Sequence, residues 1–166
     1  MTDAQAMGRS AVRRDCEARI TIEAPVEDVW NVISDVTRVG EWSGECRRCE
    51  WVGDSAKLAV GARFRGSNRR GWMRWARLNE VDVADAPNEL VWHTVFDATH
   101  RDSTEWRLSL RSTSDGTELT QSFRILRLSR PMEVFLGLVQ PAHRDRSNDL
   151  AGDLARLKTV VEAGAR

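Results

Sequence analysis

The order of β-patterned and helix-patterned segments constrains the fold of this chain more than any single motif does. A short alternating strand, residues 16–23, is followed by a helix with Pro25 in its first turn. Six further β-patterned segments follow with short turns between them, and residues 131–161 read as one long amphipathic helix. Short connections favour antiparallel pairing over parallel crossover units. We therefore predict an α+β domain in which a curved antiparallel sheet of six to seven strands surrounds a long C-terminal helix.

The limits of these segments follow from turn signals. We expect the later strands at residues 46–52, 62–68, 73–83, 90–96, 104–112 and 117–128. Two small helices are expected after the first strand, the second around residues 40–43. Pro141 should kink the long helix, whose second half is purely apolar on one face and should pack tightly, through Leu150, Leu154, Leu157 and Val161.

Composition limits the possible partners and the compartment. The 166 residues suit one domain, predicted at 16–163 after a flexible polar lead-in over 1–15. The formal net charge is zero, which argues against nonspecific electrostatic binding to nucleic acid or to an acidic membrane. The sequence holds no apolar stretch that could span a membrane and no secretory signal. We expect a cytoplasmic protein without integral membrane association; the sequence predicts no oligomeric state.

The three cysteines include one CxxC pair, Cys46 and Cys49. A redox CxxC usually lies at a helix N-terminus, whereas this one lies in a β-patterned segment. A zinc site needs four ligands, and no second CxxC or suitably spaced histidine pair accompanies it. We therefore expect no metal and no cofactor.

Two stretches resemble a known family. The opening APVEDVWNVISD, followed by Trp42, is similar to the start of START-like (SRPBCC) proteins. The segment GARFRGSNRRGWMRWARLNEVDVADAPNELVW resembles the polyketide cyclase/dehydrase-like branch of that superfamily. The resemblance implies a helix-grip fold with a hydrophobic cavity between the sheet and the C-terminal helix. It implies no universal catalytic motif, so we assign no catalytic residue.

The side chains that line this cavity can be predicted from strand alternation and from the helix stripe. The inward sets include Leu90, Trp92, Thr94 and Phe96 on one strand, with similar sets on its neighbours. Trp42 is placed where the family's cavity opens. The predicted ligand-binding residues are Trp42, Phe64, Asn68, Trp75, Trp92, Trp106, Gln121, Phe123, Phe135, Val139, His143 and Arg146.

Three inward polar residues, Asn68, Gln121 and His143, need partners because an unpaired buried polar group is costly. Arg146 could reach a ligand carboxylate at the same end. The pair Arg69-Arg70 is interpreted as a solvated turn.

Three functions fit these features. The first is a carrier or sensor that binds a hydrophobic small molecule such as a lipid, polyketide or isoprenoid. The second is a cyclase, aromatase or dehydratase that holds a flexible substrate in one conformation, with His143 or Arg146 polarising a carbonyl. No carboxylate partner for His143 is evident on the inward stripe, which favours the first function over the second. The third is a protein-interaction module.

Overall fold

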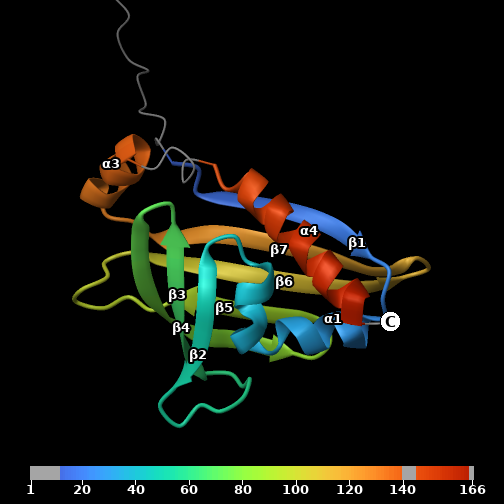
Figure 1. Cartoon of the computed structure of the whole chain (residues 1–166). Coiled ribbons are helices and arrows are strands. Elements are labelled where there is room, and N and C mark those ends of the chain that lie inside the picture. The colour runs from blue at the N-terminus through green and yellow to red at the C-terminus, as the bar shows by residue number, and fades with distance from the viewer. Residues whose placement is uncertain (1–11, 140–144, 165–166) are drawn as a thin grey trace, which may run out of the picture.

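We analysed a computed structural model in which residues 12–139 and 145–164 are described. One antiparallel sheet of seven strands has the order β1-β7-β6-β5-β4-β3-β2, so every consecutive pair from β2 to β7 forms a hairpin. The sheet curves around one helix, as Figure 1 shows. The strands are β1 (Asp15–Ile22), β2 (Cys46–Val52), β3 (Arg63–Arg70), β4 (Met73–Asp85), β5 (Glu89–Thr94), β6 (Ser103–Thr113) and β7 (Gly116–Arg127).

The first two strands lie at opposite edges of the sheet, and a helical connection spans the distance between them. It consists of α1 (Val26–Ile33), the 3-10 turn η1 (Val36–Arg38) and α2 (Val39–Trp42). Pro25 precedes α1, and the acidic residues Glu27 and Asp28 occupy its first turn, where the helix dipole favours negative charge. This connection closes one end of the space under the sheet (Figure 1).

The chain after β7 forms two helices, which corrects the prediction of one long kinked helix over 131–161. Helix α3 (Arg130–Val139) lies apart from α4 (Ser147–Gly164), and the two point in different directions (Figure 1). Pro141, which lies outside the described residues, has no backbone N–H to continue a helix. A new helix start follows, because the Asp145 carboxylate accepts hydrogen bonds from the Ser147 backbone N–H at 2.9 Å and from its hydroxyl at 2.6 Å.

Helix α4 crosses the concave face beside β1 and packs as the sequence predicts. Its predicted apolar face is almost completely buried: Leu150, Leu154, Leu157 and Val161 are each at most 3% exposed. The core continues into α1 and the inner faces of the strands. This is the predicted α+β helix-grip architecture.

The fold also includes residues that the sequence analysis assigned to the lead-in. Val12 is 2% exposed, and the Arg14 carbonyl accepts a hydrogen bond from the Ile125 backbone N–H at 2.8 Å. Residues 12–15 therefore pack with the domain.

Candidate ligand-binding site

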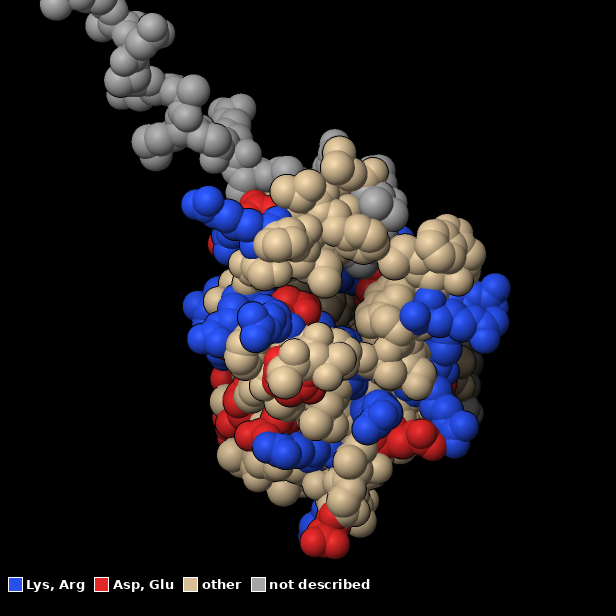
Figure 2. Space-filling model, turned by 90° about the vertical axis from the view of Figure 1, so that its left-hand side faces the viewer, with Lys and Arg blue, Asp and Glu red and all other residues tan. Residues whose placement is uncertain are grey.

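A cavity of about 630 Å³ lies between the concave face of the sheet and helices α2, α3 and α4. It opens at the end of the molecule where Figure 2 shows a hollow between apolar surfaces. Aromatic rings form much of its wall. Phe64 and Trp92 pack edge to face with their centroids 6.0 Å apart, and Trp106 and Phe123 pack with tilted rings and centroids 5.1 Å apart. The wall is therefore apolar over most of its area and rigidly packed.

Strand alternation locates most of this wall correctly. Ten predicted site residues line the cavity: Trp42, Phe64, Asn68, Trp75, Trp92, Trp106, Gln121, Phe123, Phe135 and Arg146. His143 lies outside the described residues, as does the side chain of Val139. That these side chains bind a ligand stays a prediction. Phe96 does not face inward as predicted, because β5 ends at Thr94 and Phe96 is 44% exposed in the loop beyond it.

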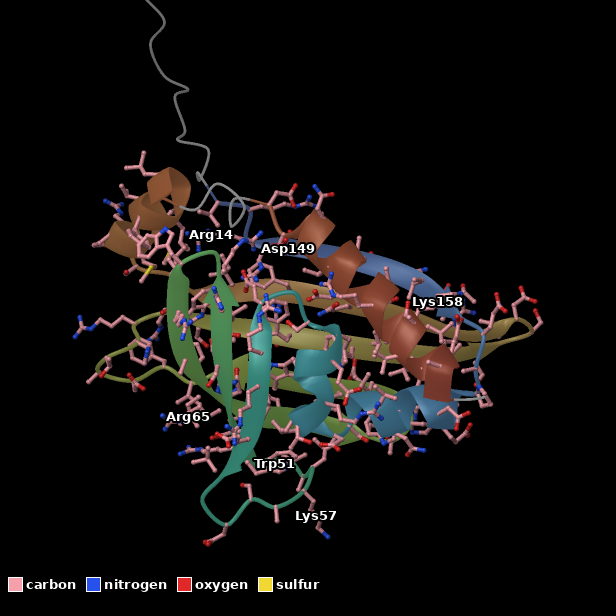
Figure 3. The ribbon with its side chains drawn as sticks, viewed as in Figure 1. Arg14, Trp51, Lys57, Arg65, Asp149 and Lys158 are labelled. Carbon is pink, nitrogen blue, oxygen red and sulfur yellow. The ribbon has the colours of Figure 1, made fainter. Side chains whose placement is uncertain are left out.

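A charged cluster on the cavity wall joins three segments of the chain. Arg70, at the end of β3, donates a hydrogen bond to Glu45 at 2.8 Å. It also forms a bidentate pair with the Asp149 carboxylate of α4, with distances of 2.8 and 3.0 Å. The Glu45 carboxylate also accepts a hydrogen bond from the Arg146 guanidinium. These bonds, led by that with Asp149, raise the pKa of Arg70. Figure 3 shows Asp149 at the start of α4, toward the ends of β2 and β3.

This cluster corrects two parts of the sequence interpretation. Arg70 is an ion-paired residue of the cavity wall, whereas only Arg69 is exposed as expected for a solvated turn. The inward side of α4 does carry a carboxylate, on Asp149, and Glu45 supplies a second from the loop before β2. Sequence spacing could not reveal the cluster because its contacts join residues up to 101 positions apart.

The Arg146 guanidinium contacts two aromatic rings and one carboxylate. Its guanidinium carbon lies 5.2 Å from the Trp106 ring centroid and 5.4 Å from that of Phe123, both within the range of a cation–π interaction. Glu45 neutralises its charge, and the side chains of both residues are about one-seventh exposed. Because Glu45 already neutralises Arg146, a ligand carboxylate would compete with Glu45 for this charge.

A second carboxylate of α4, Asp153, faces the same cavity. It accepts hydrogen bonds from the Gly44 backbone N–H at 2.8 Å and from Arg156. Burial nevertheless raises the pKa of the Asp153 carboxyl, since both partners only partly replace the lost water. Arg156 in turn donates to the Trp42 carbonyl at 2.8 Å, which ties α4 to α2.

Several buried polar atoms on the cavity wall have no hydrogen-bond partner within the described part of the chain. They are Trp42 Nε1, Arg77 Nε, Gln121 Oε1 and Arg146 Nε. The predicted inward amide Asn68 instead donates to the Gly66 carbonyl at 3.4 Å. Two further polar residues of the wall, Asn79 and Arg77 of β4, were not predicted. Asn79 donates to the Phe64 and Arg77 carbonyls, and Arg77 pairs with Asp102 at 2.5 Å. The cavity thus presents three donors and one acceptor that the described protein groups leave open.

The two cysteines of the CxxC pair also face the cavity. Residues three apart on a regular strand point to opposite faces. The register with β3 shifts between Cys46 and Arg48, so that Cys46 lies opposite Asn68 and Cys49 opposite Gly66, on the same face. Both thiols are buried, and their Sγ atoms are 3.2 Å apart.

The described histidines do not complete a catalytic set. His93 Nδ1 lies 2.8 Å from an Asp82 carboxylate oxygen, away from the cavity-lining residues. His100 lies in the loop before β6, at the edge of the cavity. No group of three or more potential metal-ligating side chains occurs among the residues the structure describes.

The rim of the opening is apolar and flanked by arginines. On α3, Val134, Phe135 and Leu138 are 58%, 41% and 74% exposed, and Trp72 in the β3–β4 turn is 85% exposed. Figure 2 shows an uncharged surface beside the hollow, with basic side chains on both sides of it. Phe135 contributes to both the rim and the cavity wall.

A curved sheet that grips a C-terminal helix around an apolar cavity defines the class of helix-grip proteins, whose fold binds hydrophobic ligands. Within this class, the chain belongs to the START-like (SRPBCC) family described as "Polyketide cyclase / dehydrase and lipid transport", which it matches over residues 13–162. The predicted family is thereby confirmed. No curated protein matches the chain, and the described residues include no helix long and apolar enough to cross a membrane.

Solved structures share the fold at low sequence identity. A protein from Thermus thermophilus superposes with a TM-score of 0.72 and 17% identity, covering 92% of this chain and 99% of that one. The Zhui aromatase/cyclase from Streptomyces sp. R1128 gives 0.71 and 15%, covering 92% and 96%. A polyketide cyclase-like protein from Corynebacterium glutamicum gives 0.60 and 24%, covering 96% of each chain. These similarities establish the fold alone.

Proposed function

We propose that this protein binds an apolar small molecule of the lipid, polyketide or isoprenoid type in its sheet–helix cavity and acts as a carrier or sensor. The observation that carries the proposal is the cavity itself, about 630 Å³ in volume and largely aromatic, with a few buried polar atoms that lack partners among the described residues. A mostly apolar pocket with a few convergent polar groups is the usual form of a small-molecule site.

The polar atoms suggest which part of the ligand they would meet. Trp42 Nε1 and Arg77 Nε can only donate, so they fit carbonyl, ether or hydroxyl oxygens on the ligand. Gln121 Oε1 can only accept, so it fits a hydroxyl. Because Arg70, Arg77 and Arg146 are each paired with a carboxylate of the cavity wall, an uncharged ligand with a few oxygen atoms fits beside them better than a carboxylic acid.

Native mass spectrometry of the purified protein, followed by organic extraction, tests this proposal. We expect a reproducible apolar species of defined mass, and we expect the Trp42→Ala variant to retain less of it. Val60→Ala, in the loop between β2 and β3 and 69% exposed, serves as a surface control that should retain the same amount. A purified protein that carries no ligand and binds none of a panel of apolar fluorescent probes would contradict an accessible binding cavity.

The second candidate is a cyclase, aromatase or dehydratase that uses the same cavity. One observation favours it: the carboxyl of Asp153, with a raised pKa, and the guanidinium of Arg146 line one cavity. A carboxyl with a raised pKa can serve as a general acid, and a guanidinium can polarise a carbonyl. Incubation of the extracted ligand with fresh protein distinguishes the two functions. Loss of about 18 Da, the mass of one water, indicates a dehydrating enzyme, and an unchanged mass with a changed chromatographic retention indicates a cyclase, whereas an unchanged compound favours a carrier.

A further inference from the structure

The two thiols on the cavity wall have a geometry that ordinary packing does not require. The bulge in β2 brings Cys46 and Cys49 to the same face, where their sulfur atoms are in contact at 3.2 Å. Gly66 lies opposite them on β3, and a Cβ there would be 3.6 Å from the Cys49 sulfur and 3.7 Å from the Cys46 sulfur. Glycine therefore places no side chain of its own beside the pair, and the Asn79 amide nitrogen lies 3.6 Å from the same point.

Access to the pair comes from the cavity. Both side chains are buried, at 7% and 4% exposure, yet both line the cavity wall. A reagent small enough to enter the cavity can therefore reach sulfur atoms that are shielded from the outer surface of the sheet. The sulfur atoms then need to approach by only about 1 Å to reach the bonding distance of about 2.05 Å.

We propose that Cys46 and Cys49 form a redox-active dithiol that small hydroperoxides, entering through the cavity, oxidise to an intramolecular disulfide. The Cys46 thiolate attacks one peroxide oxygen, which forms a sulfenic acid and releases hydroxide, or an alkoxide from an alkyl hydroperoxide. The Cys49 thiol then attacks the sulfenic sulfur, forms the disulfide and releases water. In total, two thiols lose two electrons and two protons, and the peroxide is reduced to water, or to water and an alcohol.

The assignment of the two roles follows from the contact between the thiols. Either thiol can donate the hydrogen bond between them; with Cys49 as the donor, this bond lowers the pKa of Cys46, whereas the same bond and burial raise the pKa of Cys49. Cys46 is therefore the thiolate that attacks, and Cys49 resolves the intermediate.

The third cysteine provides an internal control. Cys16 on β1 packs against Phe123 and Leu150, and burial raises the pKa of its thiol. It should therefore stay reduced under conditions that oxidise the CxxC pair.

The experiment uses the whole chain and hydrogen peroxide and needs no bound ligand. We expect the loss of two free thiols per chain and of about 2 Da, reversed by dithiothreitol. Trypsin cleaves after Arg47 and Arg48, between the two cysteines, so a disulfide would join the peptides 39–47 and 49–57 in a non-reducing digest. The peptide 15–19, which carries Cys16, should remain separate and free.

Single-cysteine variants test the two roles. Cys49→Ser should stop at a sulfenic acid on Cys46, trapped by dimedone, whereas Cys46→Ser should leave Cys49 unmodified. Circular dichroism of each variant establishes that it is folded. Absence of the joined peptides in folded wild-type protein, or joined peptides that contain Cys16, would overturn the proposal.

Protection by an apolar probe tests access through the cavity. A fluorescent probe present at about ten times its Kd should slow oxidation about tenfold, because about one protein in ten is then empty. An unchanged rate with a bound probe would overturn the proposed route. Because disulfide formation is measured without ligand, its failure is distinguishable from failure of the binding function.

Discussion

Replacement of Gln121 by leucine should stabilise the protein. It lies in the middle of β7, is 2% exposed, and its side-chain oxygen has no hydrogen-bond partner in the described chain. A buried acceptor left unpaired costs about 1–3 kcal/mol, and leucine removes it at similar size. We expect Gln121→Leu to raise the free energy of unfolding by about 1–2 kcal/mol, the lower part of that range, because leucine does not have the shape of glutamine and must repack at this buried position.

Chemical denaturation with urea, read by tryptophan fluorescence, measures this change. A gain of that size corresponds to a rise in Tm of about 2–8 °C for a chain of this length. Two control variants are measured in the same assay, one expected to be neutral and one expected to be destabilising. Thr120→Val, whose residue is adjacent on the strand and faces the other side of the sheet, should change stability by less than about 0.5 kcal/mol. Gln121→Glu should be destabilising because it places a carboxylate at the same buried position.

The same substitution should impair binding. If Gln121 accepts a hydrogen bond from the ligand, its loss weakens binding by about 1 kcal/mol, or about fivefold in Kd. A folded Gln121→Leu protein that is less stable than wild type by about 1 kcal/mol or more would refute the reasoning. The oxygen would then have to be hydrogen-bonded in the unliganded protein.

Three further predictions concern the rest of the site and the helix that closes it. Glu45→Gln should lower the free energy of unfolding by about 3 kcal/mol in urea, because it leaves the largely buried Arg146 guanidinium without its carboxylate; an unchanged value would mean that water replaces Glu45. For Asp153, whose folded pKa is raised above the ordinary 3.8, stability should fall as pH rises from about 4 through the folded pKa. In urea titrations across that range, Asp153→Asn should lack this fall, and identical pH slopes would exclude the effect. Leu157→Ala, at 0% exposure, should cost about 2–5 kcal/mol, whereas Leu138→Ala, at 74% exposure, should cost little in the same assay; equal losses would contradict the packing of α4.

Local sequence patterns predicted much of the inner wall. Alternation along β5, β6 and β7 placed Trp92, Trp106, Gln121 and Phe123 on one face, and the structure has all four on the cavity wall. This works because side chains of a strand alternate with a period of two, so one buried face specifies the register of the whole strand. The same rule failed at Phe96, where the strand ends two residues earlier than predicted.

Local sequence patterns did not predict two features of the structure. The apolar stripe over 131–161 predicted one helix, because periodicity alone does not show where a helix stops and a new one starts. The spacing of Cys46 and Cys49 would place their side chains on opposite faces of a regular strand, and a bulge has no reliable signature in one sequence. The contact between the two thiols therefore depends on an irregularity of β2 that the β-patterned segment does not reveal.

The sequence by itself determined the order of the strands and most apolar residues of the cavity wall, because hydrophobic periodicity and turn chemistry act over a few neighbouring residues. Its resemblance to a known family indicated the helix-grip class. Only the tertiary structure decided which charged and reactive groups meet. The contacts of Glu45 with Arg146 and of Arg70 with Asp149 join residues 101 and 79 positions apart. Such contacts depend on how the sheet curves and where α4 crosses it, and those are properties of the packed molecule that no local segment encodes.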